Sequence, residues 1–400
     1  MDDSVGQRII TARRVRRLTQ QELADKAGIS RSYLQKLETG SRPTSHSVLV
    51  KLARTMRVEV SRLTGQPYDT DPGPEDQLVH GVIPELRRVM LCYRDPSPSP
   101  LLPAREFEEL YVAVEEVNRH RRAASYARVA PALPGLLTEL GALALAETPG
   151  SLASREAYGL LAQVYRGVNS LAHKLGYLDL STAALERVEW AARLSDDPLL
   201  VATARYLLAG AMLREGAYAP ARRVLEQLER DLVDIESRDA RGLFGAVLLK
   251  RVMVQARSGD VSAMRSDLDQ AAEVAARLGG GDAVFYETAF GTAQVGIYRA
   301  AAAIEIGDYD TAVRDGGALV LPDDMPAERS SHHHIDQAHA RLVAGDRGGA
   351  WESLRTARRI APLHTRKHPR TRDTVGTLLR LERADDESRL GFARWAGVAI

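Results

Sequence analysis

The chain has 400 residues, 44% of them hydrophobic and 27% charged, which excludes a disordered chain and indicates at least two folded domains. Its net charge of +1 is unevenly spread, because residues 1–66 carry 13 Lys and Arg against 6 Asp and Glu, while the remainder carries 41 against 47. A basic N-terminal region is typical of a nucleic-acid binder. The single cysteine, Cys92, excludes an internal disulfide and any Cys-X-X-Cys metal or redox motif, which is consistent with a reducing compartment.

Helix-forming residues dominate, aromatic residues make up only 5%, and we expect no substantial β-sheet. No apolar run approaches the roughly 20 residues that span a bilayer, and the N-terminus lacks the features of a signal peptide. We therefore expect a cytoplasmic, nucleoid-associated protein with no membrane partner. Arginine outnumbers lysine 48 to 6, which indicates a GC-rich genome and favours an actinobacterial source.

The first predicted helix runs from about Val5 to Leu18 and is followed by two short helices between Thr19 and Gly40. Thr19 with Glu22 three residues later forms a capping box, and Ser30 is a good N-cap for the next helix. Gly28 occupies the turn, where a residue that tolerates positive φ is needed. Ala24 is small enough to let the two helices cross closely. This spacing predicts a helix-turn-helix.

Residues 4 to 65 resemble the five-helix DNA-binding domain of phage repressors of the Cro and C1 type. The resemblance implies that the helix from Ser30 to Glu38 enters the major groove, and that Arg13 pairs with Glu38 for structure. Some of the side chains are expected to contact base edges and others the phosphate backbone. The predicted DNA-binding residues are Arg16, Arg17, Gln20, Arg31, Ser32, Tyr33, Gln35, Lys36, Ser41 and Arg42. Tyr33 is equally well explained as a packing residue at the rim.

A Pro- and Gly-rich stretch, GQPYDTDPGP at 65–74, predicts a hinge or linker after the first domain. We assign residues 1–66 to the helix-turn-helix domain, 67–74 to the linker and 75–400 to a second domain. A further proline cluster at 95–103 predicts a long loop inside that domain.

Internal repetition dominates residues 75–400. A pattern of glycine followed five residues later by a small residue recurs as GAYAPA at 216, GDYDTA at 307 and GDRGGA at 345, with looser copies at 176 and 259. Each glycine is expected to end one helix, and the small residue to let the next helix approach. The predicted fold is all-α, with the N-terminal domain followed by an α-solenoid of helix pairs that resemble degenerate tetratricopeptide repeats.

This order of domains resembles the Gram-positive peptide-pheromone receptors and actinobacterial regulators of the same layout. We expect binding of double-stranded operator DNA as a homodimer, because one such domain covers only a half-site. We also expect a peptide or small-molecule effector in the solenoid groove, although the resemblance does not identify the signal. We place that effector at Tyr286, Gln294, Tyr298, His332, His333 and Asp336. The spacing of Tyr286, Phe290, Gln294 and Tyr298 predicts that these four share one helix.

The sequence contains no motif typical of nucleotide, zinc-protease, serine-hydrolase or dinucleotide sites, so we expect no enzymatic activity and no cofactor. His332, Asp336 and His339 share a helical face and could hold a metal, but a polar patch in the groove is the preferred interpretation and no metal is assigned. Two functions remain in view. One is a DNA-binding transcriptional regulator that senses a signal, and the other is an interaction scaffold with a vestigial DNA-binding domain.

Overall fold

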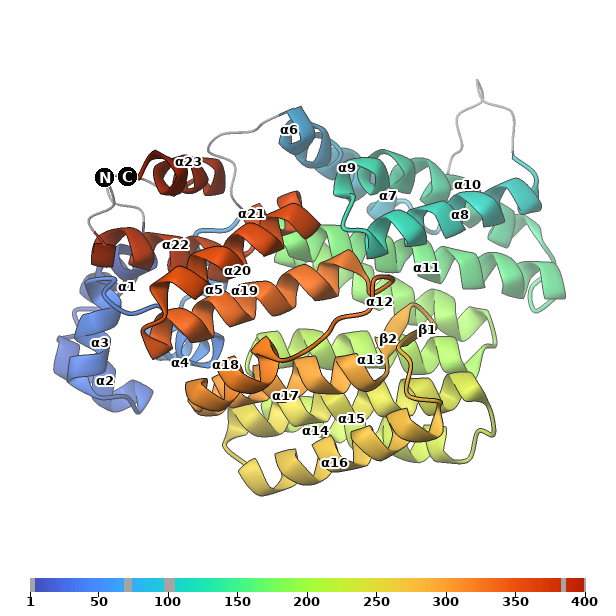
Figure 1. Cartoon of the computed structure of the whole chain (residues 1–400). Helices are drawn as coiled ribbons and strands as arrows, with labels where there is room; N and C mark the ends of the chain where they lie inside the picture. Colours follow the sequence, from blue (N-terminus) through green and yellow to red (C-terminus); the bar gives the residue numbers. More distant parts are fainter. Residues whose placement is uncertain (1–3, 68–73, 97–104, 383–385, 399–400) are drawn as a thin grey trace.

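The computed structural model describes residues 4–67, 74–96, 105–382 and 386–398 and is helical almost throughout. Five short helices form the N-terminal domain (Figure 1): α1 (Val5–Val15), α2 (Gln20–Ala27), α3 (Arg31–Glu38), α4 (His46–Met56) and α5 (Val60–Thr64). Their apolar faces enclose one small core around Ile9, Leu23, Leu34 and Leu52. The all-α, two-part architecture expected from the sequence is therefore confirmed.

The predicted starts of α2 and α3 are confirmed, whereas the first helix ends at Val15 and not at Leu18 as predicted. Thr19 and Glu22 form a reciprocal capping box at the start of α2. Gly28 ends α2 at φ 66°, in the left-handed region that favours glycine. Ser30 caps α3 by accepting a hydrogen bond from the Tyr33 amide, and Ala24 is fully buried. The local sequence thus fixes the angle at which α3 leaves the turn.

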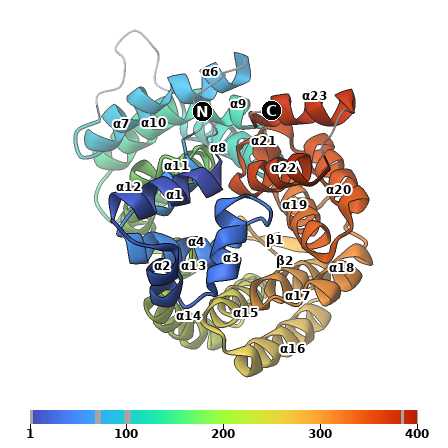
Figure 2. The same ribbon diagram turned by 90° about the vertical axis from the view of Figure 1, so that its left-hand side faces the viewer.

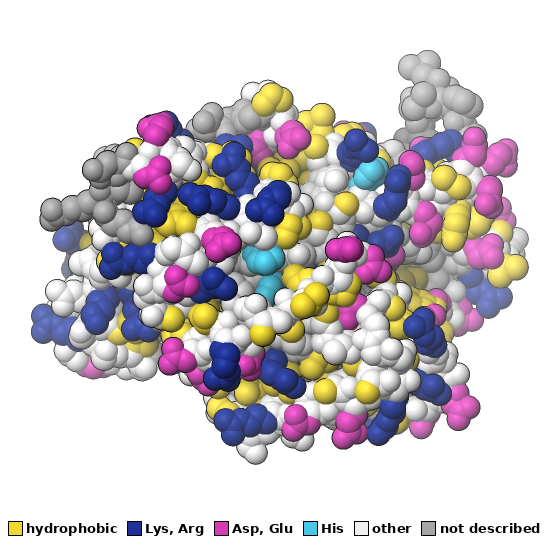
Figure 3. All heavy atoms as spheres, in the orientation of Figure 1, with side chains coloured by type: hydrophobic (Ala, Val, Ile, Leu, Met, Phe, Trp, Pro, Cys, Tyr) yellow, Lys and Arg dark blue, Asp and Glu magenta, His cyan; other side chains and the backbone are white. Residues whose placement is uncertain are grey.

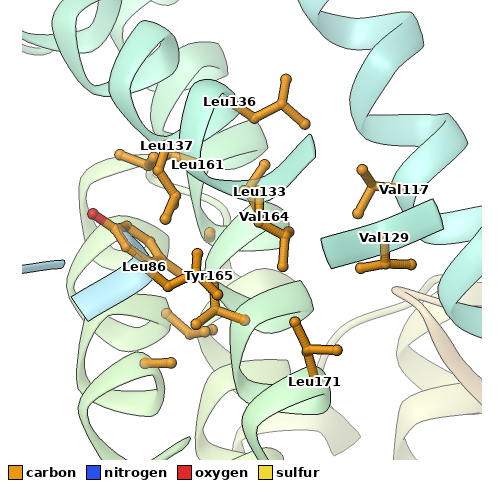
Figure 4. Close-up of a cluster of buried hydrophobic side chains, with 14 of the residues drawn as sticks. Leu86, Val117, Val129, Leu133, Leu136, Leu137, Leu161, Val164, Tyr165 and Leu171 are labelled. Carbon is orange, nitrogen blue, oxygen red and sulfur yellow. The ribbon is translucent and has the colours of Figure 1, made fainter. Parts of the chain in front are cut away.

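The second domain opens with a helical layer on α11 (Leu152–Leu175). That layer comprises α6 (Pro74–Gly81), α7 (Ile83–Leu91), α8 (Phe107–Arg122), α9 (Tyr126–Val129), a 3-10 turn (Ala130–Ala132) and α10 (Leu133–Ala146). Figure 4 shows how Leu86, Val117, Leu133 and Leu137 meet Leu161 and Val164 of α11. Most of the predicted proline loop and linker, residues 97–104 and 68–73, lies outside the described residues.

One stretch in this layer, Tyr126–Ala146, is long and apolar enough by composition alone to cross a membrane, with a mean hydropathy of 1.5. The expectation that no such stretch exists was wrong, because α9 and α10 run on through the 3-10 turn. Leu133, Leu136 and Leu140 from this stretch are at most 1% exposed in the core against α11. Its apolar composition is thus explained by packing.

Five helix pairs follow the layer: α11 with α12 (Leu178–Leu194), α13 (Pro198–Arg214) with α14 (Tyr218–Val233), α15 (Arg238–Ser258) with α16 (Val261–Arg277), α17 (Thr292–Ile306) with α18 (Tyr309–Gly317), and α19 (Ala327–Ala344) with α20 (Arg347–Ile360). The chain ends with α21 (Pro362–Lys367), α22 (Pro369–Glu382) and α23 (Glu387–Ala396). In α23, Phe392 packs against Trp351 of α20. This contact closes the end of the stack.

The repeated glycines end the first helix of every pair, as predicted. Gly176, Gly216, Gly259, Gly307 and Gly345 all have φ between 72° and 92°. The residues five positions later are at most 5% exposed: Ser181, Ala221, Met264, Ala312 and Ala350. A small or flexible side chain at that position lets the second helix lie close against the first.

A β-hairpin interrupts the repeats and corrects one prediction. β1 (Ala283–Phe285) pairs antiparallel with β2 (Thr288–Phe290), so Tyr286 and Phe290 do not share a helix with Gln294 and Tyr298. Phe285 and Phe290 instead occupy the space left by Gly242 and Gly245 on α15. Asp282 then caps α17 by accepting hydrogen bonds from the backbone amides of Ala293 (2.8 Å) and Gln294 (3.2 Å).

The helix pairs curve far enough to bring the two ends of the second domain together. Asp76 of α6 pairs with Arg366 (3.0 Å) and Lys367 (3.2 Å) of α21, and α21 also contacts α11. Viewed end-on in Figure 2, the pairs run around the helix-turn-helix domain, which lies over their centre. The N-terminal domain is thus packed against the concave side of the repeats.

Candidate DNA interface and interdomain cavity

The outer face of α3 is free of the rest of the chain. Arg31, Ser32, Gln35 and Lys36 are all exposed, whereas Leu34 and Leu37 are buried in the domain core. Lys and Arg side chains gather at the left-hand end of Figure 3, where Figure 1 places this domain. The four exposed side chains offer hydrogen-bond donors and acceptors that suit base edges in a major groove.

Two residues predicted to contact DNA have structural partners in the same domain. Arg16 donates from Nε to the Met56 carbonyl (2.6 Å) and from Nη2 to the Arg57 carbonyl (3.0 Å), so it satisfies the C-terminus of α4. Gln20 donates from its amide to Glu38 (2.7 Å). Each of these side chains therefore has a partner within the domain, and contact of Arg16 and Gln20 with DNA stays a prediction, as does a phosphate contact at the start of α2.

Glu38 is the acceptor at the centre of this arrangement. Arg13 donates to it from Nε (2.6 Å) and Nη2 (3.1 Å), and the Glu38 side chain is only 3% exposed. This bidentate pair links α1 to α3, as the family resemblance implied.

The loop after α3 holds the remaining predicted backbone contacts. Ser41 is exposed and donates its hydroxyl to the Lys36 carbonyl (3.2 Å). The Arg42 guanidinium lies 5.2 Å from the centre of the Tyr33 ring, and Tyr33 is half-buried against the domain core. Burial raises the pKa of Tyr33 to about 12. Arg17, after the end of α1, is also exposed and has a left-handed conformation with φ 55°.

The helix-turn-helix domain is held on the repeats by four contacts from α4 and the loop before it. The Thr44 amide donates to Asp373 (2.6 Å), and Arg380 donates to the Gly40 carbonyl (3.0 Å). His46 Nε2 bonds the Arg214 carbonyl (2.8 Å), and Arg54 donates to the Gly216 carbonyl (3.0 Å). Because none of these contacts uses α3, the docked domain still presents its predicted reading face.

A cavity of about 300 Å³ lies between the two domains. The first helix of every pair, together with α21 and α22, supplies its inner wall. The helix-turn-helix domain supplies the outer wall through Val5, Thr44, His46, Leu49, Val60 and Thr64. A molecule in this cavity would contact both domains at once. Its volume is at the lower end of the range for small-molecule sites.

Three of the six predicted effector residues line this cavity, namely Tyr298, His332 and Asp336. The other three do not. Tyr286 lies in the hairpin turn and donates its hydroxyl to Asp197 (2.9 Å), and the His333 ring bonds the Gly316 carbonyl (3.1 Å). Gln294 is fully buried elsewhere on α17. Half of the predicted side chains therefore line the interdomain cavity, and the rest of its wall comes from other residues.

Histidines concentrate at the cavity wall. The His332 and His368 rings are 4.8 Å apart, and the His332 and His364 rings are 6.0 Å apart. Burial lowers the pKa of all three well below the ordinary value, and neighbouring charged groups, Lys174 among them, contribute. Within the described ranges no three His, Cys, Asp or Glu side chains are placed to hold a metal ion.

Sequence reasoning missed most of the cavity wall. Its basic residues are Lys174, Arg214, Arg257, Arg329, Lys367 and Arg370. Each comes from a different helix, so no local motif marks the set. The available signal was the recurrence of four of them, Lys174, Arg214, Arg257 and Arg329, on the first helices of repeats.

Comparisons with known proteins agree with the N-terminal geometry. A helix-turn-helix family model matches residues 9–63. The immunity repressor protein of Bacillus phage phi105 is 43% identical over 63 residues, which cover 16% of this chain and 44% of that protein. The chain therefore spans under half the length of that relative. Residues 9–63 form a helix-turn-helix domain of the phage-repressor type.

Two solved structures resemble larger parts of the chain. BtubC (BKLC) from P. vanneervenii matches with a TM-score of 0.38 at 16% identity, covering 63% of this chain and 91% of that one. PlcR from Bacillus thuringiensis, solved with the peptide PapR7 and DNA, matches with a TM-score of 0.30 at 12% identity, covering 91% and 98%.

Proposed function

We propose that this protein is a sequence-specific DNA-binding transcriptional regulator of the cytoplasm and nucleoid. The observation that carries the proposal is the exposed, polar face of α3 on a phage-repressor-type domain with a large excess of basic residues. Arg31, Ser32, Gln35 and Lys36 read bases, while Arg17, Ser41, Arg42 and the start of α2 hold phosphates.

The repeat domain serves as the sensor and holds a homodimer. One helix-turn-helix covers a half-site, and a single module of this size buries too little surface for regulatory affinity, so two copies are needed. A peptide or small-molecule effector occupies the interdomain cavity. Because both domains line that cavity, its occupation changes how firmly the DNA-binding domain is held on the repeats.

Selection of bound fragments from genomic DNA tests the function directly. The purified chain should enrich a two-fold symmetric sequence, and gel shifts on that sequence should weaken steeply with salt as phosphate contacts are lost. Sedimentation of the complex should give two chains per site. A folded protein that enriches no sequence over bulk DNA would contradict the proposal and favour the scaffold.

A further inference from the structure

Four of the six basic residues in the cavity wall have carboxylate partners. The pairs are Lys174 with Glu328 (2.7 Å), Arg257 with Glu305 (3.0 Å), Lys367 with Asp76 (3.2 Å), and Arg370 with Asp336. Arg214 and Arg329 are the other two. Across the described part of the chain, no Asp or Glu side chain forms an ion pair with either guanidinium.

Two more cations without a carboxylate lie close to these arginines. The Lys250 ammonium is 3.6 Å from the centre of the Tyr206 ring. Arg166, which is 8% exposed, donates to the carbonyls of Tyr286 (2.8 Å) and Glu287 (2.6 Å). These four cations come from α11, α13, α15 and α19, and the Lys250 Nζ and Arg214 Nη1 atoms both lie within 4 Å of the space beside Gly210 on α13.

Burial disfavours the charged forms of Lys250, Arg214 and Arg166, whereas Tyr298 and the neighbouring Glu328 raise the pKa of Arg329. Burial lowers the pKa of Lys250 well below its usual value, and Arg329, Arg214 and Arg166 lower it further. Burial also lowers the pKa of Arg214 to about 10 and of Arg166 to about 9. Buried charges in proteins are normally paired, since an unpaired one costs several kcal/mol of folding free energy.

The rest of the wall suits a molecule with an apolar body and further polar groups. Leu49, Met253 and Ile297 supply apolar surface. The Nε2 atom of His364 and the Nδ1 atom of His173 have no hydrogen-bond partner within the described ranges, and both residues line the cavity. Buried polar atoms of this kind are usually satisfied by a ligand or by water.

We propose that the cavity binds a small organic anion whose carboxylate or phosphate group is held by Arg214 and Arg329. Lys250 and Arg166 add positive potential behind them. A guanidinium pair matches the planar or tetrahedral oxygens of such a group better than it matches a halide. Leu49 and Val60 of the helix-turn-helix domain contact the apolar body, so the anion bridges both domains. This effect on the DNA-binding domain rests on the function proposed above, whereas anion binding itself does not.

A pair of fluorescent dyes tests the charge requirement. Full-length protein is titrated with anionic 1-anilinonaphthalene-8-sulfonate and with uncharged N-phenyl-1-naphthylamine. Arg329→Met and Arg214→Met should each weaken the anionic dye by about tenfold, the contribution of a charge-assisted hydrogen bond, and leave the neutral dye unchanged. Arg277→Met removes an exposed arginine paired with Glu273 and is the matched control. Equal binding of the anionic dye by all four proteins would overturn the proposal.

Thermal unfolding supplies a second test, because the proposal and a purely structural role predict changes of opposite sign in the unfolding midpoint. Lys250→Met should raise the midpoint in chloride, because it removes an uncompensated charge, and a lysine needed only for packing would give a lower midpoint. Phosphate at matched ionic strength should stabilise the wild type more than it stabilises Arg214→Met/Arg329→Met. General salt effects act on the wild type and on the double variant alike. If phosphate stabilised both proteins equally beyond the effect of chloride, the anion site would be overturned.

Gel shifts with and without the bound dye separate this inference from the proposed function. Loss of the anion site leaves sequence-specific DNA binding intact. Conversely, the protein could bind the anionic dye in the cavity and recognise no DNA sequence. That result would refute the proposed regulatory function and leave the anion site standing.

Discussion

At the scale of single residues, the exposed side chains of α3 and the loop after it have different expected tasks. Arg31 is at the start of the recognition helix, where a guanidinium can bond two acceptors of one guanine. The Arg42 guanidinium lies over Tyr33 in the loop after α3, and we expect it to contact the phosphate backbone. Sequence preference and overall affinity should therefore depend on different arginines.

Arg31→Ala should cost about 1 to 3 kcal/mol of binding free energy on the selected site and little on random DNA. Arg42→Ala should weaken both to a similar degree and reduce the salt dependence by about one phosphate contact. Gel shifts of both variants on both DNAs measure the difference. Equal losses on the two DNAs from Arg31→Ala would remove Arg31 from the base-reading set.

Glu38 has a structural role that is separate from reading. Glu38→Ala leaves the largely buried Arg13 without its carboxylate, with only the Leu18 carbonyl as acceptor, and should lower the free energy of unfolding by about 3 to 5 kcal/mol. Chemical denaturation of the isolated residues 1–66, whose core contains only their own side chains, measures the loss. Glu189→Ala in the full chain breaks an exposed pair with Arg193 and should cost at most about 1 kcal/mol. If Glu38→Ala and Glu189→Ala lowered the free energy of unfolding by similar amounts, the structural role of Glu38 would be contradicted.

The residue scale also shows where sequence reasoning reaches its limit. The family resemblance predicts the pairing of Arg13 with Glu38. Local rules predict the roles of Thr19, Gly28 and Ser30, because caps and turns depend on neighbours in sequence. The bond from Arg16 to the Met56 carbonyl could not be predicted in this way, because its acceptor lies 40 residues further along the chain. Exposure of a basic residue on a helix does not by itself tell a DNA contact from a helix cap.

At the scale of elements, the repeat glycines differ in what surrounds them. All five have left-handed backbones, but a Cβ atom at Gly216 would overlap Val50 of α4, whereas one at Gly259 would meet nothing within 4 Å. Gly216 therefore serves two purposes, since it ends α13 and also admits the helix-turn-helix domain. Gly259 serves only the first.

Gly259→Ala should lower stability by about 1 to 2 kcal/mol through backbone strain and leave the domains docked. Gly216→Ala should add a collision with Val50 and release the helix-turn-helix domain from the repeats. Small-angle scattering or protease cleavage between residues 68 and 73 measures the release. If both variants stayed equally compact and equally resistant, α4 would not depend on the turn at Gly216.

Element-level patterns predicted the repeats well and the hairpin not at all. Glycine and alanine at fixed spacing reveal helix pairs because every pair needs the same turn and the same close contact. The aromatic spacing from Tyr286 to Tyr298 fits a helix, but Asp282 caps α17 only at Ala293, and Phe285 and Phe290 fill gaps left by glycines on α15. That filling depends on tertiary packing and has no local signal.

Acid should weaken the contact between the domains through His46. Burial lowers its pKa to about 4 in the docked domain, and Arg257 lowers it further, while a released domain returns it to an ordinary value near 6.5. The contribution of neutral His46 to the free energy of docking is therefore fully present above about pH 6.5. It falls by about 1.4 kcal/mol per pH unit as the pH decreases from there toward 4.

His46→Gln keeps a donor for the Arg214 carbonyl and removes the titration. Protease cleavage between residues 68 and 73, measured from pH 7.5 to pH 5, should increase more in the wild type than in this variant. The comparison between the two proteins is needed because Asp373, whose pKa burial raises to about 6, favours docking in acid. Identical pH profiles would remove His46 from the docking balance.

At the scale of the whole molecule, docking sets how two recognition helices are presented. A dimer must match half-sites about 34 Å apart, and a helix-turn-helix domain held on the repeats by four contacts has little freedom to adjust. Docking leaves α3 exposed, so it restricts spacing without blocking the reading face. Occupation of the cavity can therefore act on operator choice through the position of this domain.

A disulfide across the domain contact tests this directly. A Cβ at Gly216 would lie 3.6 Å from the Cβ of Val50, within the range that a disulfide spans, so Val50→Cys/Gly216→Cys with Cys92→Ser should crosslink the docked domain when oxidised. The oxidised protein should bind the selected operator and lose affinity sharply when one or two base pairs are added between half-sites. After reduction it should tolerate those spacings better, because the domain can then break its four hydrogen bonds to the repeats and undock on DNA. Either single-cysteine variant should show no redox effect. Equal tolerance in both redox states, or loss of operator binding on oxidation, would show that the docked arrangement is not the one that recognises DNA.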